Sequence, residues 1–143
     1  MIDGDARTIG ALPPGEIITR LRTTTTTTNH PPAPVMTMLG EVVVHGQDIR
    51  GAVGQPSTTD PQAVAACLQM YSGANFPLGA KKRINGLRLV AGDVEWTNGE
   101  GAEVCGLGIS LLMAMTGRRA GLDGLTGDGV ATLRRRMPPA TTV

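Results

Sequence analysis

The sequence is poor in aromatic residues: only Tyr71, Phe76 and Trp96 occur among 143 residues. Surfaces that stack nucleic-acid bases need aromatic side chains, so this scarcity argues against a single-stranded nucleic-acid binder. The formal net charge is only +1, which gives no electrostatic reason to expect nucleic acid or an anionic membrane as a partner. We therefore expect neither partner.

Long apolar segments and a secretory leader are also missing from the sequence. No apolar run approaches the roughly 20 residues that span a bilayer, and the N-terminal MIDGDARTIG lacks the basic start and apolar middle of a signal peptide. The two cysteines, Cys67 and Cys105, lie in separate apolar segments, and we interpret them as thiols of a reducing compartment rather than a disulfide. These features predict a soluble, cytoplasmic protein.

Helical signals fill the first half of the sequence, whereas strand signals begin after residue 74. No period is clear over residues 1–12. The predicted helices run from about Pro14 into the threonine run 23–28, from Pro34 to about Val53, and from an N-cap at Asp60 to Gly73. Predicted strands at 87–91, 94–97 and 102–105 precede two helices at about 107–116 and 128–137. The sequence thus predicts an α+β fold with two parts, residues 1–73 and 74–143.

The stretch GEVVVHGQDIR, residues 40–50, allows two interpretations. Its three consecutive valines favour a strand, yet a period of two leaves neither side consistently apolar. At 100° per residue, six residues fall within an arc of about 120°; they are Leu39, Val42, Val43, Gly46, Ile49 and Val53. The periodicity therefore favours a helix.

In such a helix, Glu41 and His45 lie one turn apart, with Cβ atoms roughly 5–6 Å from each other. A carboxylate oxygen and an imidazole nitrogen can then converge on one metal ion at about 2.0–2.2 Å each. Asp48 follows one turn later, either as a third ligand or as the acceptor that fixes the His45 tautomer. The alternative is an ordinary surface pair, since Glu-x3-His is common on helices and a catalytic zinc usually needs three protein ligands.

Four segments resemble one known family, the mycothiol-dependent maleylpyruvate isomerase family of actinobacteria. They are LPPGEIITRLR, LGEVVVHGQDIRGAVG, FPLGAKKRINGLRLVAGDVEWTNGEGAEVCG and LLMAMTGRRAGLDGLTGDGVATL, which together cover most of residues 11–136. The resemblance implies a DinB-like metal-binding four-helix bundle, followed by a small α/β domain similar to sterol-carrier domains. It also implies that Glu41 and His45 are metal ligands.

The same resemblance implies a chemistry and a cofactor set. A divalent metal, expected to be zinc, and mycothiol as thiol cosubstrate serve a cis–trans isomerase or thiol transferase acting on an electrophilic or unsaturated carboxylate. Arg50 is a possible partner of the substrate carboxylate, with a helix-end structural arginine as the alternative.

One feature of the family is missing here. Its members carry about two further helices, with the first metal-ligating His near a W-T-V-x-D-x-x-A-H-L-like stretch, and this sequence has neither. We expect an N-terminally shortened member in which His30 is the only other histidine. A partial bundle would expose apolar helix faces and favour a homo-oligomer. The alternative functions are a non-catalytic module that binds an apolar ligand or a protein partner, and a fragment without activity.

Overall fold

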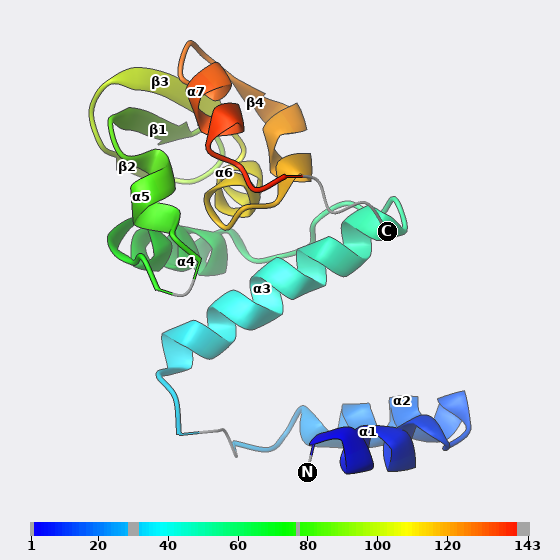
Figure 1. Ribbon diagram of the computed structural model, residues 1–143. Helices are drawn as coiled ribbons and strands as arrows, with labels where there is room; N and C mark the ends of the chain where they lie inside the picture. The colour runs from blue at the N-terminus through cyan, green and yellow to red at the C-terminus, as the bar shows by residue number, and fades with distance from the viewer. Residues whose placement is uncertain (1, 29–31, 77, 140–143) are drawn as a thin grey trace. The chain divides into compact units, whose positions relative to one another are not determined.

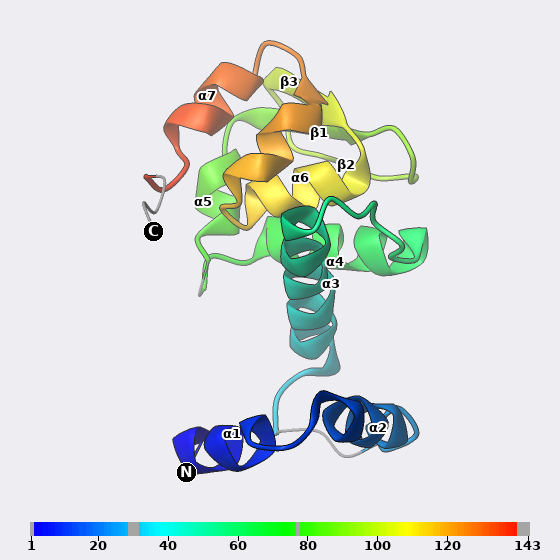
Figure 2. The same ribbon diagram turned by 90° about the vertical axis from the view of Figure 1, so that its right-hand side faces the viewer.

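A computed structural model describes residues 2–28, 32–76 and 78–139 (Figures 1 and 2). The chain divides into two compact units, Met1–Ala33 and Pro34–Val143. Helices and a four-stranded mixed sheet confirm the predicted α+β class. The expected division at residue 74 falls inside the second unit, where helices on both sides of that residue share one hydrophobic core.

The first unit consists of two helices, α1 (Ile2–Gly10) and α2 (Pro14–Thr24). The sequence analysis missed α1, although Ile2, Ala6 and Ile9 recur at helical spacing in it, because the segment is short and contains two glycines. Helix α2 begins at the proline pair and ends in the threonine run, as expected. There, each hydroxyl from Thr23 to Thr27 donates to the carbonyl three residues earlier, at 2.7–3.2 Å. Such side-chain bonds compete with the helical ladder and favour its end.

The second unit holds five α-helices and one 3-10 helix in its described part. They are α3 (Val35–Ala52), α4 (Pro61–Gly73), α5 (Ala80–Ile84), α6 (Gly108–Met115), the 3-10 helix η1 (Arg119–Gly124) and α7 (Val130–Arg135). The predicted N-cap of α4 is confirmed, since the Asp60 carboxylate accepts a hydrogen bond of 2.7 Å from the backbone N–H of Gln62. Within the described residues, no helix combines the length and the hydropathy needed to cross a bilayer.

The sheet of the second unit has the order β2-β1-β3-β4. Its central strands, β1 (Leu87–Ala91) and β3 (Ala102–Gly106), pair in parallel, with Leu89 opposite Val104. Short edge strands, β2 (Thr97–Asn98) and β4 (Leu125–Thr126), pair antiparallel to β1 and β3. The second predicted strand is therefore shorter than expected and starts at the last residue of the range 94–97.

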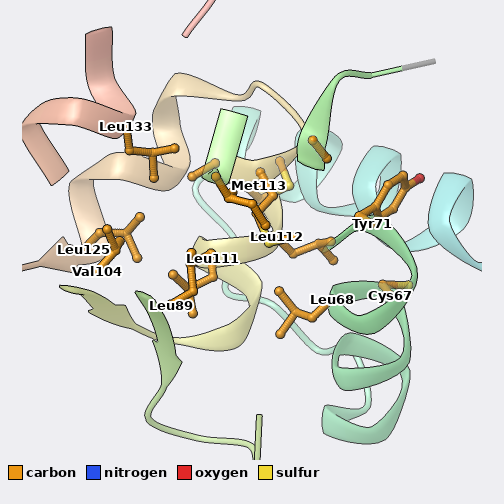
Figure 3. Close-up of a cluster of buried hydrophobic side chains, with 14 of the residues drawn as sticks. Cys67, Leu68, Tyr71, Leu89, Val104, Leu111, Leu112, Met113, Leu125 and Leu133 are labelled. Atoms are coloured by element: carbon orange, nitrogen blue, oxygen red, sulfur yellow. The ribbon is translucent and has the colours of Figure 1, made fainter. Parts of the chain in front are cut away.

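Helix α6 is the centre of the hydrophobic core. It packs between the sheet and α4 and contacts η1 along its length (Figures 1 and 2). Leu111, Leu112 and Met115 are completely buried in the core. Leu111 lies beside Leu89 of the sheet, and Leu112 faces Leu68 of α4 (Figure 3). A helix that is apolar on all sides is typical of such a central position. The carboxylate of Asp93 supports its start by accepting a 2.6 Å hydrogen bond from the backbone N–H of Gly108.

Helix α3 forms as predicted, but its buried side differs from the predicted apolar arc. Gly40, Val43 and Val44 are buried, whereas Val42 and Ile49 are 72% and 68% exposed. The cause is the close approach to α4 at Gly40, where a Cβ atom would lie 2.5 Å from the hydroxyl oxygen of Tyr71. A glycine contributes nothing to an apolar pattern, although it allows the closest helix contact.

Candidate functional site

A partly exposed flank of α3, next to the side that packs on α4, carries the acidic and histidine side chains that the sequence singled out. Nε2 of His45 lies 3.1 Å from a carboxylate oxygen of Glu41, and Nδ1 lies 3.4 Å from Oδ2 of Asp48. The side chains of Glu41 and His45 are each 58% exposed, and that of Asp48 is 36% exposed. Two turns of helix therefore place a carboxylate at each nitrogen of a single imidazole.

This arrangement fits part of a metal site. Donor atoms 3.1 Å apart, one from Glu41 and one from His45, can both lie about 2.1 Å from one ion. Asp48 faces the other imidazole nitrogen, which suits an acceptor that fixes the tautomer better than a third ligand. Among the described residues, no group of three or more His, Cys, Asp and Glu side chains is placed to hold a metal. His30 lies outside the described residues.

Arg118 belongs to the same cluster, although the sequence analysis missed it. Its Nε and Nη2 atoms donate to Oδ2 of Asp48 at 3.3 and 3.1 Å, and its Nη1 donates to the carbonyl of Thr116 at 3.1 Å. These charge-assisted bonds tie α3 to the connection between α6 and η1. Asp48 and Arg118 are 70 residues apart in the sequence, so no local spacing predicts their pairing.

Tyr71 lies beneath this cluster and is only 6% exposed. Burial raises the pKa of its phenol above the ordinary value, and the negative charge of Glu41 raises it further, followed by a smaller effect of Cys67. The charge of Arg118 acts in the opposite direction and is the smallest of these effects. Tyr71 therefore stays a neutral phenol at neutral pH, which suits packing against Gly40 rather than an anionic ligand.

A pocket of about 370 Å³ begins at Asp48 and extends between α3, α6 and η1. Its walls combine apolar side chains with a few polar groups, and they are formed by Gln47, Asp48, Gly51, Ala52, Ile109, Ser110, Met113, Ala120 and Gly121. The Oε1 atom of Gln47 is buried and has no hydrogen-bond partner among the described residues. The pocket thus offers an apolar volume with an unused acceptor beside the carboxylate of Asp48.

Arg50 lies in the last turn of α3 and is half-buried. At 100° per residue it projects about 140° around the helix from His45. Its side chain makes no hydrogen bond or ion pair with the described residues. The helix thus brings Glu41, His45 and Asp48 together but does not direct Arg50 to the same side.

Comparisons with protein-family models, with curated proteins and with solved structures found no match to this chain.

Proposed function

We propose that Glu41 and His45 are two ligands of a divalent metal, zinc, in a thiol-dependent isomerase or transferase. The observation that carries this proposal is the 3.1 Å separation of their donor atoms on one exposed helix face. Zinc bound there supplies the acidity that converts a thiol such as mycothiol to its nucleophilic thiolate. In this proposal, α3 and α4 are part of a DinB-like bundle, and residues 74–143 form a sterol-carrier-like domain.

The neighbouring residues have supporting roles. Asp48 holds the His45 imidazole with its proton on Nδ1, which leaves Nε2 free to bind the metal. Arg118 fixes Asp48 and keeps a positive charge beside the cluster, where an unsaturated carboxylate substrate binds. The pocket between α3, α6 and η1 holds the carbon skeleton of that substrate. The third ligand comes from outside the described residues or from a second subunit.

Metal content tests the proposal directly. Purified protein, dialysed against zinc and then against buffer, is measured by mass spectrometry beside the variants Glu41→Ala and His45→Ala. Glu16→Ala is the matched control, because Glu16 forms the same type of i,i+4 pair, with Arg20 on α2, without a histidine. About one zinc per chain, lost in both α3 variants and kept in the control, is expected. Equal zinc in all four proteins would show that the metal lies elsewhere or binds without specificity.

A second assay tests the thiol chemistry. Zinc-loaded protein is incubated with mycothiol and an unsaturated dicarboxylate, and the isomer or the thioether adduct is measured by chromatography. Turnover that requires both mycothiol and His45 supports the reaction class. Stoichiometric zinc without any turnover would support the metal site but contradict the proposed enzymatic activity.

The pocket also favours a second candidate function, a non-catalytic module for an apolar ligand. Ile109 and Met113 line it, and its volume of about 370 Å³ lies within the range of small-molecule sites. A fluorescent fatty acid would then bind saturably in the absence of metal, and Met113→Glu would abolish binding. Loss of binding on zinc removal would instead assign the pocket to the metal-dependent function.

A further inference from the structure

The second unit contains a basic pocket that the proposed function does not use. The pocket has a volume of about 570 Å³, and it is lined by Gly79, Lys82, Arg83, Asn85 and Arg136. It lies where α5 meets the end of α7, and α7 lies beside α5 in both views (Figures 1 and 2). Three of its five described lining residues are cationic, and none is acidic.

The cations of the pocket belong to short basic segments of the sequence. Eight of the 13 lysines and arginines come from three short segments, with three residues in 81–83, two in 118–119 and three in 134–136. Among the described residues, Arg118 is the only member of these segments that pairs with a carboxylate. Of these eight residues, Lys82, Arg83 and Arg136 line the pocket, so the fold brings two of the three segments together there.

Arg83 occupies the inner part of the pocket. Its guanidinium donates to the carbonyl oxygens of Met115 and Leu78, and its Nε is buried without a partner among the described residues. Burial lowers the pKa of Arg83 from its ordinary value, and the nearby positive charge of Arg118 lowers it further. Carbonyl oxygens satisfy hydrogen bonds but leave a full positive charge uncompensated.

Arg136 approaches from the other side of the pocket. Its Nη1 donates to the carbonyl oxygens of Arg83 at 2.8 Å and of Asn85 at 2.7 Å. These bonds fix the guanidinium at the end of α5, with its remaining N–H groups not engaged by the described residues. Lys82, one residue before Arg83, has an exposed side chain at the pocket. Two guanidinium groups are therefore held in place by backbone carbonyls, and a flexible ammonium group stands beside them.

We propose that this pocket binds a phosphate group of a small, soluble ligand. Three fixed or nearby cations match the charge of a dianionic tetrahedral phosphate, and guanidinium groups form paired bonds with phosphate oxygens. A single carboxylate would leave two of the three charges uncompensated. The volume is that of a small-molecule site rather than of a surface that follows a polymer backbone.

Calorimetric titration with pyrophosphate tests this proposal at constant ionic strength set with sodium chloride. Saturable binding of one pyrophosphate per chain is expected. Lys82→Gln should weaken it at least about fivefold, the effect of removing one charge at roughly 4 Å in a water-like medium, and Lys82→Arg should restore it. Lys81→Gln is the matched control, because Lys81 lies next to Lys82 on α5 but does not line the pocket.

Several results would overturn the proposal. Absence of saturation, or an equal loss in Lys81→Gln and Lys82→Gln, would mean diffuse attraction by a basic surface. Equal affinity for malonate would mean that the pocket does not select phosphate. Binding to phosphatidic acid vesicles without binding to pyrophosphate would assign the phosphate to a lipid headgroup. The α3 variants Glu41→Ala and His45→Ala, which should lose zinc, should leave the pyrophosphate affinity unchanged. The phosphate proposal can therefore fail or succeed independently of the metal proposal.

Discussion

The contact between η1 and α6 gives a stringent prediction about packing beside the candidate site. Gly121 is buried in η1 against α6 and lines the pocket that begins at Asp48. A Cβ atom at this position would lie 2.6 Å from the backbone nitrogen of Ala114 and from the carbonyl oxygen of Ser110. It would also lie 2.9 Å from Cβ of Met113. Gly121→Ala should therefore push η1 away from α6.

The size of the effect follows from these distances. An ordinary contact begins near 3.4 Å, so backbone atoms at 2.6 Å must separate by the difference, about 0.8 Å. Overpacking of this kind costs about 1–3 kcal/mol. Alanine recovers about 0.4–1 kcal/mol because it restricts the unfolded chain. The middle values of the two ranges leave a net loss of unfolding free energy of about 1.3 kcal/mol, or roughly 4–8 °C in Tm for a domain of this size.

Thermal unfolding followed by circular dichroism measures this change, with Gly46→Ala as the matched control. A Cβ on Gly46 meets no atom within 4 Å, and the residue lies inside α3. Alanine there should raise the stability by about 1 kcal/mol through helix propensity. If Gly121→Ala raised Tm as Gly46→Ala does, η1 would not rest on α6 at the distances described, and the pocket beside Asp48 would have another shape.

Three further predictions concern a helix cap and the two cysteines. Asp60→Ala should lower the unfolding free energy by about 1 kcal/mol, because the N–H of Gln62 loses its acceptor, and a shifted urea midpoint at unchanged slope checks this. The Cys105 thiol donates a hydrogen bond of 3.0 Å to the Glu103 carboxylate, and this bond is the main cause that raises the pKa of Cys105. Glu103→Gln should therefore lower the pKa of Cys105, so that iodoacetamide alkylates this thiol faster at pH 8. Cys67 is completely buried, so its labelling should require unfolding, and rapid labelling of native Cys67 would contradict the described core.

The sequence predicts helices and strands most accurately where residues within the element itself fix its start or its alternation. Proline pairs, the Asp60 cap and the alternation over 87–91 give helix starts and a strand close to their observed bounds. The sequence did not predict α5 and β4, because both are too short to show a hydrophobic period and are stabilised by contacts with other parts of the fold. Helix α5 lies against α4 and α6, whereas β4 exists only because β3 pairs with it.

The candidate site was predictable only along one helix. Spacing places Glu41, His45 and Asp48 together because helical geometry fixes which residues share a face. It cannot show that Arg118 reaches Asp48, since that contact depends on the packing of α3 beside the α6–η1 connection. Nor could it identify the buried face of α3. A close crossing at Gly40 decides that orientation, and the crossing depends on the partner helix rather than on the valines.

Net charge does not show where the charges of a chain lie. A value of +1 averages over the whole chain, and from it we expected no anionic macromolecule as a partner. The fold separates the charges, with Glu41 and Asp48 on α3 and, where α5 meets α7, cations that have no carboxylate partner within the described ranges. Arg118 lies between the two groups, because it binds Asp48 and its charge also lowers the pKa of Arg83. Anion binding depends on the local field at distances near the Debye length of about 8–10 Å, so the placement of charges decides it and the total does not.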